Sequence, residues 1–395
     1  MKCLSKTTTS IGPRKRGVLA ATAIAAMLGA AAEAAPTLEQ KVEQLTEEVE
    51  KLKQELADQK TADDGHGAGD GRTSIGGYGE LHYNSLDSKD EIDFHRFVLF
   101  IGHRFTDRIR FNSEIELEHA LVKDTSAGDG PGEIELEQAY IDFDLTANHT
   151  ARGGLFLIPV GILNEVHEPT TFYGVERNPI ESDIIPTTWW EGGAALHGRL
   201  GTDFGYDLAL HSGLKVPTTG AGAYRIRNGR QKVAKSDANN GAVTARLKWS
   251  GIPGVSAAAT VQRQSDIAQG AAADGVAGEA TLWEAHATFA RGPFGLRVLY
   301  ASWDLDGSGP KALGRDKQEG WYVEPSYKLT PSIGVFARFN RWDNEAGDSA
   351  DSEKKQRDIG LNYWPHEDVV VKLDYQNQSG AANDDGVNLG IGYMF

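Results

Sequence analysis

The sequence is poor in cysteine, in long apolar runs and in positive charge. Its 395 residues contain one cysteine, Cys3, and acids outnumber lysine and arginine by 56 to 40. Cys3 precedes the apolar run discussed next, so we expect it to leave with a cleaved leader, and the remaining chain has no means of forming a disulfide. Such a chain must be stabilised by its own packing and hydrogen bonds. The acidic balance argues against a nucleic-acid partner.

The only long apolar run, Gly17 to Ala32, follows a basic patch that ends at Arg16. A basic start, a short apolar core and the small-x-small sequence Ala32-Glu33-Ala34 predict a signal peptide over residues 1–34. A retained anchor helix is the alternative, but the core is short for a bilayer span. Removing the five basic residues and the one acid of this segment changes the net charge from -16 to -20.

Residues 35–60 carry apolar side chains spaced alternately four and three apart. This is a heptad pattern, which predicts a short α-helical coiled coil, although a single amphipathic helix resting on the rest of the protein is the alternative. Residues 61–73 are rich in glycine and aspartate and predict a flexible linker. The predicted coiled-coil core residues are Leu38, Val42, Leu45, Val49, Leu52 and Leu56.

From residue 74 to residue 395 the apolar period changes to two. Val369, Val371 and Leu373, for example, alternate with Lys372 and Asp374. This pattern predicts strands with one apolar and one polar face, which fits a soluble sandwich as well as a barrel. We predict sixteen strands, near residues 74–84, 92–105, 107–122, 133–146, 150–159, 191–201, 203–213, 241–250, 254–264, 278–290, 293–304, 318–329, 332–343, 356–364, 367–378 and 386–395.

The joins between these strands alternate between short turns and long polar loops. An even strand number with turns at one end and loops at the other is typical of a transmembrane β-barrel, and backbone groups in a bilayer require that the sheet close. The fold class is therefore an all-β, 16-stranded antiparallel barrel over residues 74–395. Aromatic residues near strand ends predict two interfacial girdles: Tyr83, Phe105, Phe143, Trp249, Phe294, Trp303, Trp321, Trp342, Tyr363, Trp364 and Tyr375.

The longest join, Val160 to Trp190, is too long for a simple surface loop. We expect it to fold into the lumen and narrow it, with an external lid or an intersubunit contact as the alternative. Its predicted constriction residues are Glu165, His167, Glu168, Arg177, Glu181 and Asp183.

Strand alternation also predicts which charges face the lumen. The predicted basic wall consists of Arg96, Arg104, Arg108, Arg110, Arg152 and Arg199, with Arg246, Lys248, Arg297, Arg338 and Lys372 facing inward on later strands. Inward acids are Glu114, Glu116, Glu118, Asp207, Glu284, Glu324, Asp358 and Asp374. Any one of these charges can instead be solvated or paired along the wall without a selective role. Together they predict a mixed lumen, and neutralising Arg152 and Arg199 is expected to favour cations.

Motifs of enzymes and of metal sites are missing. The sequence has no Gly-x-Ser-x-Gly, no His-Glu-x-x-His and no close pairing of histidine with cysteine, so we expect no enzyme activity, no cofactor and no metal. A barrel enzyme would need a nucleophile at the outer rim.

Three stretches resemble the phosphate-selective porin O and P family over roughly residues 74–395. They are Thr171-Phe172-Tyr173-Gly174, the run from Asn178-Pro179 to Trp189-Trp190, and the terminal Gly390-Ile391-Gly392-Tyr393-Met394-Phe395. The resemblance implies a homotrimer of sixteen-stranded barrels. It also implies that Tyr393 and Phe395 form the signal presented to the barrel assembly machinery.

The expected function is passive diffusion of small hydrophilic solutes or ions through the bacterial outer membrane. The resemblance adds anions such as phosphate. The partners are then membrane lipid and further copies of the chain, with the coiled coil in the periplasm because both barrel ends lie on that side. The alternative is a structural protein tethered to periplasmic partners through the coiled coil.

Overall fold

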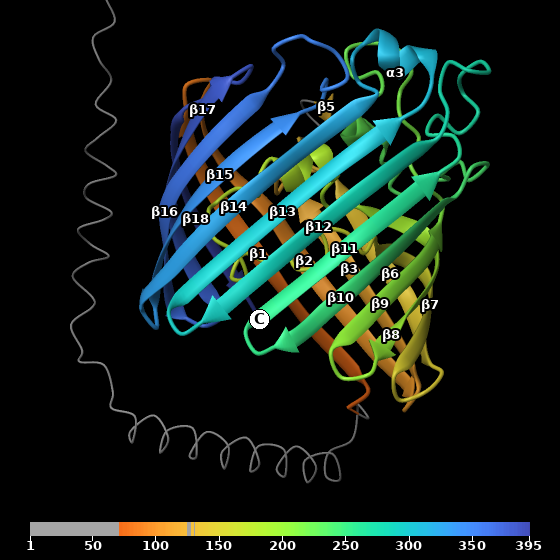
Figure 1. Cartoon of the computed structure of the whole chain (residues 1–395). Coiled ribbons are helices and arrows are strands. Elements are labelled where there is room, and N and C mark those ends of the chain that lie inside the picture. Colours follow the sequence, from red (N-terminus) through yellow and green to blue (C-terminus); the bar gives the residue numbers. More distant parts are fainter. Residues whose placement is uncertain (1–70, 125–127, 130) are drawn as a thin grey trace, which may run out of the picture. The chain divides into compact units, whose positions relative to one another are not determined.

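A computed structural model describes residues 71–124, 128–129 and 131–395, and within them one closed barrel (Figure 1). The predicted signal peptide and the coiled-coil core residues lie outside the described residues. The first eight barrel strands are β1 (Thr73–Leu86), β2 (Asp90–Thr106), β3 (Ile109–Glu118), β6 (Ile134–Asp144), β7 (His149–Leu157), β8 (Trp190–Leu200), β9 (Phe204–His211) and β10 (Ala242–Ile252). The second eight are β11 (Val255–Gln264), β12 (Ala280–Arg291), β13 (Phe294–Leu305), β14 (Lys317–Thr330), β15 (Ile333–Asp343), β16 (Lys354–His366), β17 (Val369–Gly380) and β18 (Gly386–Met394).

Each barrel strand pairs antiparallel with its neighbours, and β1 pairs with β18 to close the sheet. At the seam Tyr78 lies opposite Met394. The backbones of Gly77 and Phe395 exchange two hydrogen bonds of 2.9 Å. Closure leaves no strand edge unpaired, as a bilayer requires. The predicted sixteen-stranded antiparallel barrel is confirmed, and the strands begin and end within a few residues of their predicted limits.

Most tight turns lie at the opposite end of the barrel from the long loops (Figure 1), although the three-residue join 87–89 is at the loop end. Seven tight turns of two to four residues lie at one end, as at 107–108 and 253–254. The long loops lie at the other end with α3 (Ser308–Ala312) and the small hairpin β4 (Lys123–Asp124) and β5 (Gly128–Asp129). The two longest are residues 158–189, which we call the inward loop, and residues 212–241, which we call the second loop. They contain the short helices η1 (Ile180–Ile184) and η2 (Ile226–Gly229).

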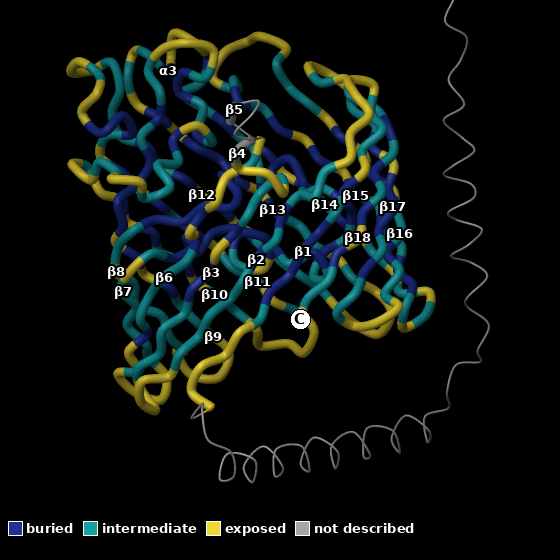
Figure 2. The backbone as a smooth tube through the Cα atoms, turned by 180° about the vertical axis from the view of Figure 1, so that it is seen from behind, coloured by how far each residue is buried: buried dark blue, intermediate teal, exposed yellow. Residues whose placement is uncertain are grey.

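The outer face of the wall is apolar. Trp283, Ile359 and Leu210 expose 58%, 64% and 62% of their surface, whereas their neighbours Leu282, Asp358 and Ala209 face inward and are buried. Figure 2 shows exposed backbone mainly at the two rims and buried segments in the interior. Among the described residues no helix is long and apolar enough to span a membrane. The apolar band on the strands is the surface suited to lipid.

The interior is not a simple water-filled tube. An apolar cluster fills one side of it, where the two loops pack against the inner face of the wall. Its members include Ile180, Ile184 and Trp189 of the inward loop, Leu214 and Ile226 of the second loop, and Trp303, Tyr322 and Trp342 of the wall.

The prediction of interfacial girdles needs a correction at three tryptophans. Trp303 and Trp342 are buried and point inward. The Nε1 atom of Trp303 donates to the Ile184 carbonyl at 3.0 Å, and that of Trp342 to Asp183 Oδ2 at 3.1 Å. Trp364 likewise donates to a carbonyl of the inward loop at 3.4 Å. Each indole therefore anchors the loop, a contact that strand periodicity could not reveal.

Candidate functional site

The inward loop crosses the interior of the barrel and is fixed by side chains of the wall. Asp374 of β17 accepts a 2.6 Å hydrogen bond from the backbone N–H of Val175. Arg297 of β13 donates to the Thr171 carbonyl at 2.8 Å. Further hydrogen bonds come from β15, β16 and β1: Asn362 to Phe172 O, Arg338 to Tyr173 O and Glu176 O, and His82 and Asn84 to the Glu176 carboxylate. Because β15 and β16 lie opposite β7 and β8 in the ring of sixteen strands, and the loop begins at β7 and ends at β8, the loop spans the lumen.

Glu181 holds the loop together and does not face the channel. Its Oε1 atom accepts 2.6 Å hydrogen bonds from the backbone N–H groups of Ile162 and Leu163. Its Oε2 atom accepts bonds from Asn178 at 2.9 Å and from the Tyr322 hydroxyl at 3.0 Å. With three donors from the loop, one from the wall and no exposed surface, this carboxylate has its hydrogen-bonding capacity filled. The expectation that Glu181 lies on the narrowest ring is therefore corrected.

The other predicted constriction residues have separate positions. Glu165 forms an ion pair with Arg246 of β10. Asp183 accepts a hydrogen bond from Trp342 and lines a separate cavity of about 310 Å³ with residues of the second loop. His167 is 3% exposed and lies against the wall, so it is not pore-lining. Of the predicted constriction residues, only Arg177 lines the polar cavity near β3 and β6 that is described below. Glu168 is partly buried outside that cavity.

Three arginines of the two loops are held by neutral oxygens. Arg177 Nη1 donates to Thr188 Oγ1 at 3.0 Å, and Arg230 Nη1 donates to the Thr188 carbonyl at 2.8 Å. Arg227 donates to the Ser182 carbonyl. Burial lowers the pKa of Arg177 and of Arg230, yet an arginine stays charged at neutral pH. Since none of the three has a carboxylate in ion-pair contact within the described part of the chain, their charges remain available to a solute.

These arginines face a polar cavity of about 360 Å³ whose opposite side is acidic. Glu118, Glu133, Glu135 and Glu137 come from the loop ends of β3 and β6. Lys232 of the second loop reaches across and bonds Glu133 and Glu135. The remaining lining residues are His95, Arg96, His119, Glu176, Arg177, Ser182, Thr187, Thr188, Trp190, Arg227 and Arg230. Apart from Glu176 on the inward loop and Arg96 on the wall, which is paired with wall glutamates, the cavity has a cationic side made by loops and an anionic side made by the wall.

The predicted basic wall is divided between the interior and the turn end. Arg96 is buried and pairs with Glu80 at 2.8 Å and Glu116 at 3.3 Å. Arg152 pairs with Asp142 at 2.8 Å. Arg110 pairs with an aspartate at the turn, and Arg104, Arg108 and Arg199 are exposed near the turn end. Most of these charges are neutralised by neighbours or lie away from the cavity.

Three basic residues of the cavity, Arg227, Arg230 and Lys232, did not emerge from the sequence. They lie in the second loop, where no strand periodicity assigns a direction to a side chain. The available signal was the basic run Arg225 to Lys232, which is unusual in a chain whose acids are in excess. A basic run in a long loop of an acidic barrel was the clue to the cationic side of the cavity.

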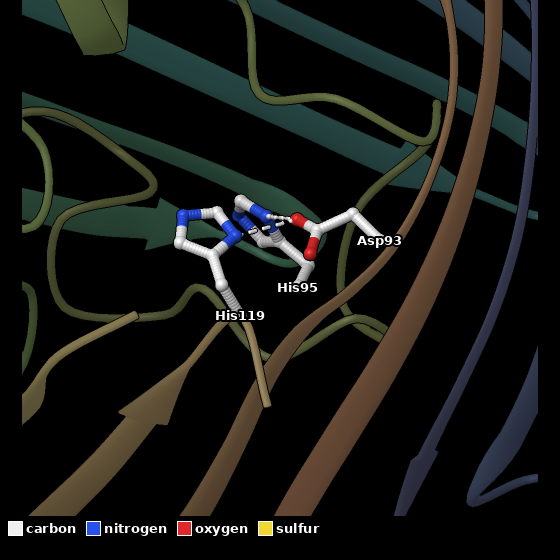
Figure 3. A group of neighbouring side chains, drawn as sticks. All are labelled: Asp93, His95 and His119. Atoms are coloured by element: carbon white, nitrogen blue, oxygen red, sulfur yellow. Dashed lines mark hydrogen bonds and ion pairs between the residues drawn. The ribbon is translucent and has the colours of Figure 1, made fainter. Parts of the chain in front are cut away.

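A group with the side chains of a metal site, Asp93, His95 and His119, lies on the same wall (Figure 3). Both Nδ1 atoms face Asp93 Oδ2, at 3.2 Å from His95 and 2.8 Å from His119. Arg96 Nη2 lies 2.9 Å from His95 Nε2 and can only donate, so the His95 proton is on Nδ1. Asp93 therefore accepts a hydrogen bond from His95 Nδ1. The three side chains thus have hydrogen-bond partners within the group and do not need a metal ion.

A closed barrel with an apolar outer face and a charged, loop-narrowed lumen defines an outer-membrane channel protein. The family model of the phosphate-selective porin O and P proteins matches residues 75–388. The chain therefore belongs to this porin family, and its place is the outer membrane. An uncharacterized protein of Aquifex aeolicus (strain VF5) is 30% identical over 368 residues, which cover 82% of this chain and 80% of the relative.

Solved outer-membrane barrels have the same fold. The outer membrane channel DcaP of Acinetobacter baumannii matches with a TM-score of 0.55 at 15% identity, over 82% of this chain and 97% of that one. OprB of Pseudomonas putida gives 0.57 at 10% identity, over 82% and 95%. The trimer form of OmpT of Vibrio cholerae gives 0.53 at 12% identity, over 82% and 99%.

Proposed function

We propose that this porin is a passive channel for small hydrophilic solutes and ions, in which a transverse field at the polar cavity gives a weak preference for anions, phosphate included. The observation that carries the proposal is that Arg177, Arg227 and Arg230, which form no ion-pair contact among the described residues, face the acids of β3 and β6 across one cavity. Rows of opposite charge orient a passing dipole without trapping it. A phosphate-specific site would instead need convergent cations without opposing carboxylates.

Reversal potentials in planar bilayers under a KCl gradient test this proposal. The double variant Arg227→Ala/Arg230→Ala should move the preference towards cations. A charge acting on an ion at about 4 Å in water contributes about 1 kcal/mol, so the permeability ratio should change about fivefold or more. Arg199→Ala is the matched control, because Arg199 is exposed near the turn end and should have little effect.

Two outcomes would contradict the proposal. Near-complete anion selectivity, with current blocked by low phosphate, would replace the transverse field by a phosphate-specific site. A shift in Arg199→Ala as large as that in the double variant would place the selective charges at the turn end.

We infer that the protein assembles as a homotrimer in outer-membrane lipid. We also infer that the barrel assembly machinery inserts it and that the coiled-coil segment lies in the periplasm. This arrangement is supported by membership of the porin family and by the trimer form recorded for OmpT of Vibrio cholerae, whose fold is similar. The alternative is a purely structural role through the coiled coil, whose residues lie outside the described part of the chain.

A further inference from the structure

We propose that Glu114, Glu137 and His167 bind a divalent transition-metal ion of the Zn²⁺ class, which clamps the inward loop to the barrel wall. The three side chains come from β3, from β6 and from the inward loop. The proposal goes beyond the channel function and holds whichever solute passes.

The geometry of the three donor atoms carries the inference. His167 Nε2 lies 3.4 Å from Glu114 Oε1 and 3.7 Å from Glu137 Oε2. These separations are long for hydrogen bonds. They are close to the roughly 3.3 Å that separates two ligands of a tetrahedral ion with bonds of about 2.0 Å. All three donors also lie within 4.8 Å of one another.

The same three atoms lack hydrogen-bond partners. Glu114 and Glu137 are 1% exposed and His167 is 3% exposed. Within the described part of the chain, Glu114 Oε1, Glu137 Oε2 and His167 Nε2 are all buried and unpartnered. Leaving one buried polar atom unpaired costs about 1–3 kcal/mol, and here three such atoms converge on one point. A bound cation would satisfy all of them together.

The surrounding hydrogen bonds orient His167 and Glu114 so that their donor atoms can bind a metal ion. The Nδ1 atom of His167 lies 3.2 Å from the Asn164 carbonyl, which can only accept, so Nδ1 carries the proton and Nε2 presents its lone pair. Glu114 Oε2 accepts a 2.6 Å bond from Gln138, which fixes the carboxylate. Such outer contacts are the usual support of metal-binding histidine and carboxylate side chains.

A β-bulge positions Glu137, one of the three proposed ligands. Glu114 of β3 pairs with Gln138 of β6, and the next residue, Ile115, pairs with Leu136. Glu137 is thus the extra residue of the bulge and has no partner across the strands. Bulges redirect side chains and occur next to functional sites. Glu137 also lines the polar cavity, which offers an ion a route from the lumen.

The charges near the site favour a cation. Glu116 also faces the group and pairs with Arg96 at 3.3 Å, so Glu114 and Glu137 are the carboxylates left for the ion. Arg96 and Arg177, which line the same cavity, are the nearby opposing charges. The competing arrangement is an imidazolium of His167 between the two carboxylates. It would put a second proton on Nε2, at distances too long for good hydrogen bonds.

The test uses the full-length porin, purified in detergent, stripped with EDTA and titrated with Zn²⁺ alone. We expect one Zn²⁺ per chain by calorimetry and elemental analysis. Both His167→Gln and Glu137→Gln should weaken binding at least about a hundredfold, more than the loss expected for an outer contact. Heat-modifiable mobility checks that each variant is folded. His119→Gln, in the neighbouring group of Figure 3, is the matched control and should bind normally.

A second readout follows the clamp itself. Single-channel recordings should show larger current fluctuations after EDTA treatment, because the inward loop is released, and Zn²⁺ should reverse the change in the wild type but not in His167→Gln. Absence of stoichiometric Zn²⁺ binding in the wild type would overturn the proposal in favour of the imidazolium pair. Binding that survives His167→Gln but is lost in His119→Gln would move the metal to the group of Figure 3.

Discussion

The Tyr322 hydroxyl lies 3.0 Å from Glu181 Oε2 and joins the wall strand β14 to the inward loop. Both side chains are buried, and Glu181 accepts three further hydrogen bonds from within the loop itself. The loop is therefore organised around one carboxylate, and a single phenol connects that carboxylate to the barrel.

Removing the Glu181 carboxylate should destabilise the inward loop much more than removing the Tyr322 hydroxyl. Tyr322→Phe deletes one hydrogen bond, which should cost about 1 kcal/mol. Glu181→Ala leaves the buried N–H groups of Ile162 and Leu163 unpaired, at about 1–3 kcal/mol each. We expect current fluctuations to rise slightly in the first variant and strongly in the second. Equal current fluctuations in the two variants would show that contacts other than those of Glu181 hold the inward loop in place.

The close approach of the loop to the wall gives a second prediction, at Gly392 of β18. A Cβ atom there would lie 2.3 Å from Pro169 Cβ, and a proline ring on the loop has little freedom to move. Gly392→Ala should therefore push the inward loop from the wall and change the single-channel conductance. Gly153→Ala on β7 is the matched control, since its Cβ would meet no atom within 4 Å. An unchanged conductance in Gly392→Ala, with folding intact, would count against this contact.

The barrel could be predicted from the sequence because a strand obeys a local rule. Alternation assigns each residue to a face, and turn residues such as Gly201 and Gly254, both with positive φ, mark where strands end. Inward-facing Glu324, Asp358 and Asp374 are accordingly found buried in the interior. These positions depend only on neighbours in the chain.

The cavity and the loop contacts could not be predicted in the same way. Glu181 looked like a pore residue because it is charged and lies in the longest loop, but its position depends on donors 18 and 141 residues away. Arg227 and Arg230 belong to a different loop. Their side chains meet Arg177 only because both loops fold into the lumen. The pentapeptide Glu-Ile-Glu-Leu-Glu, at 114–118 and again at 133–137, was the local signal for the acidic side.

The end of the chain gives a prediction about assembly. Phe395 exchanges two backbone hydrogen bonds with Gly77, and its ring stacks on Phe97 with centroids 6.1 Å apart. Deleting Phe395 removes the closing bonds and the aromatic signal together, so folded yield should fall sharply. Phe395→Glu keeps the backbone bonds but removes the ring, and should also impair insertion. Heat-modifiable mobility in outer-membrane fractions measures the yield.

Phe395→Tyr is the control for this experiment and should assemble normally. Full yield of Phe395→Glu with failure of the deletion would show that the closing bonds, and not the aromatic ring, are what assembly requires.

Oligomeric state provides the last prediction, because two features of the chain favour different numbers of subunits. Valine at a and leucine at d in the predicted coiled coil favour a parallel dimer. A porin barrel offers a much larger wall with exposed apolar side chains such as Trp283 and Ile359. Intersubunit contact along such a wall buries more surface than three heptads, so the barrel should set the symmetry and the coiled coil should follow it. Deleting residues 38–56 should therefore leave a trimer by native mass measurement, whereas monomers after the deletion would show that the coiled coil sets the assembly.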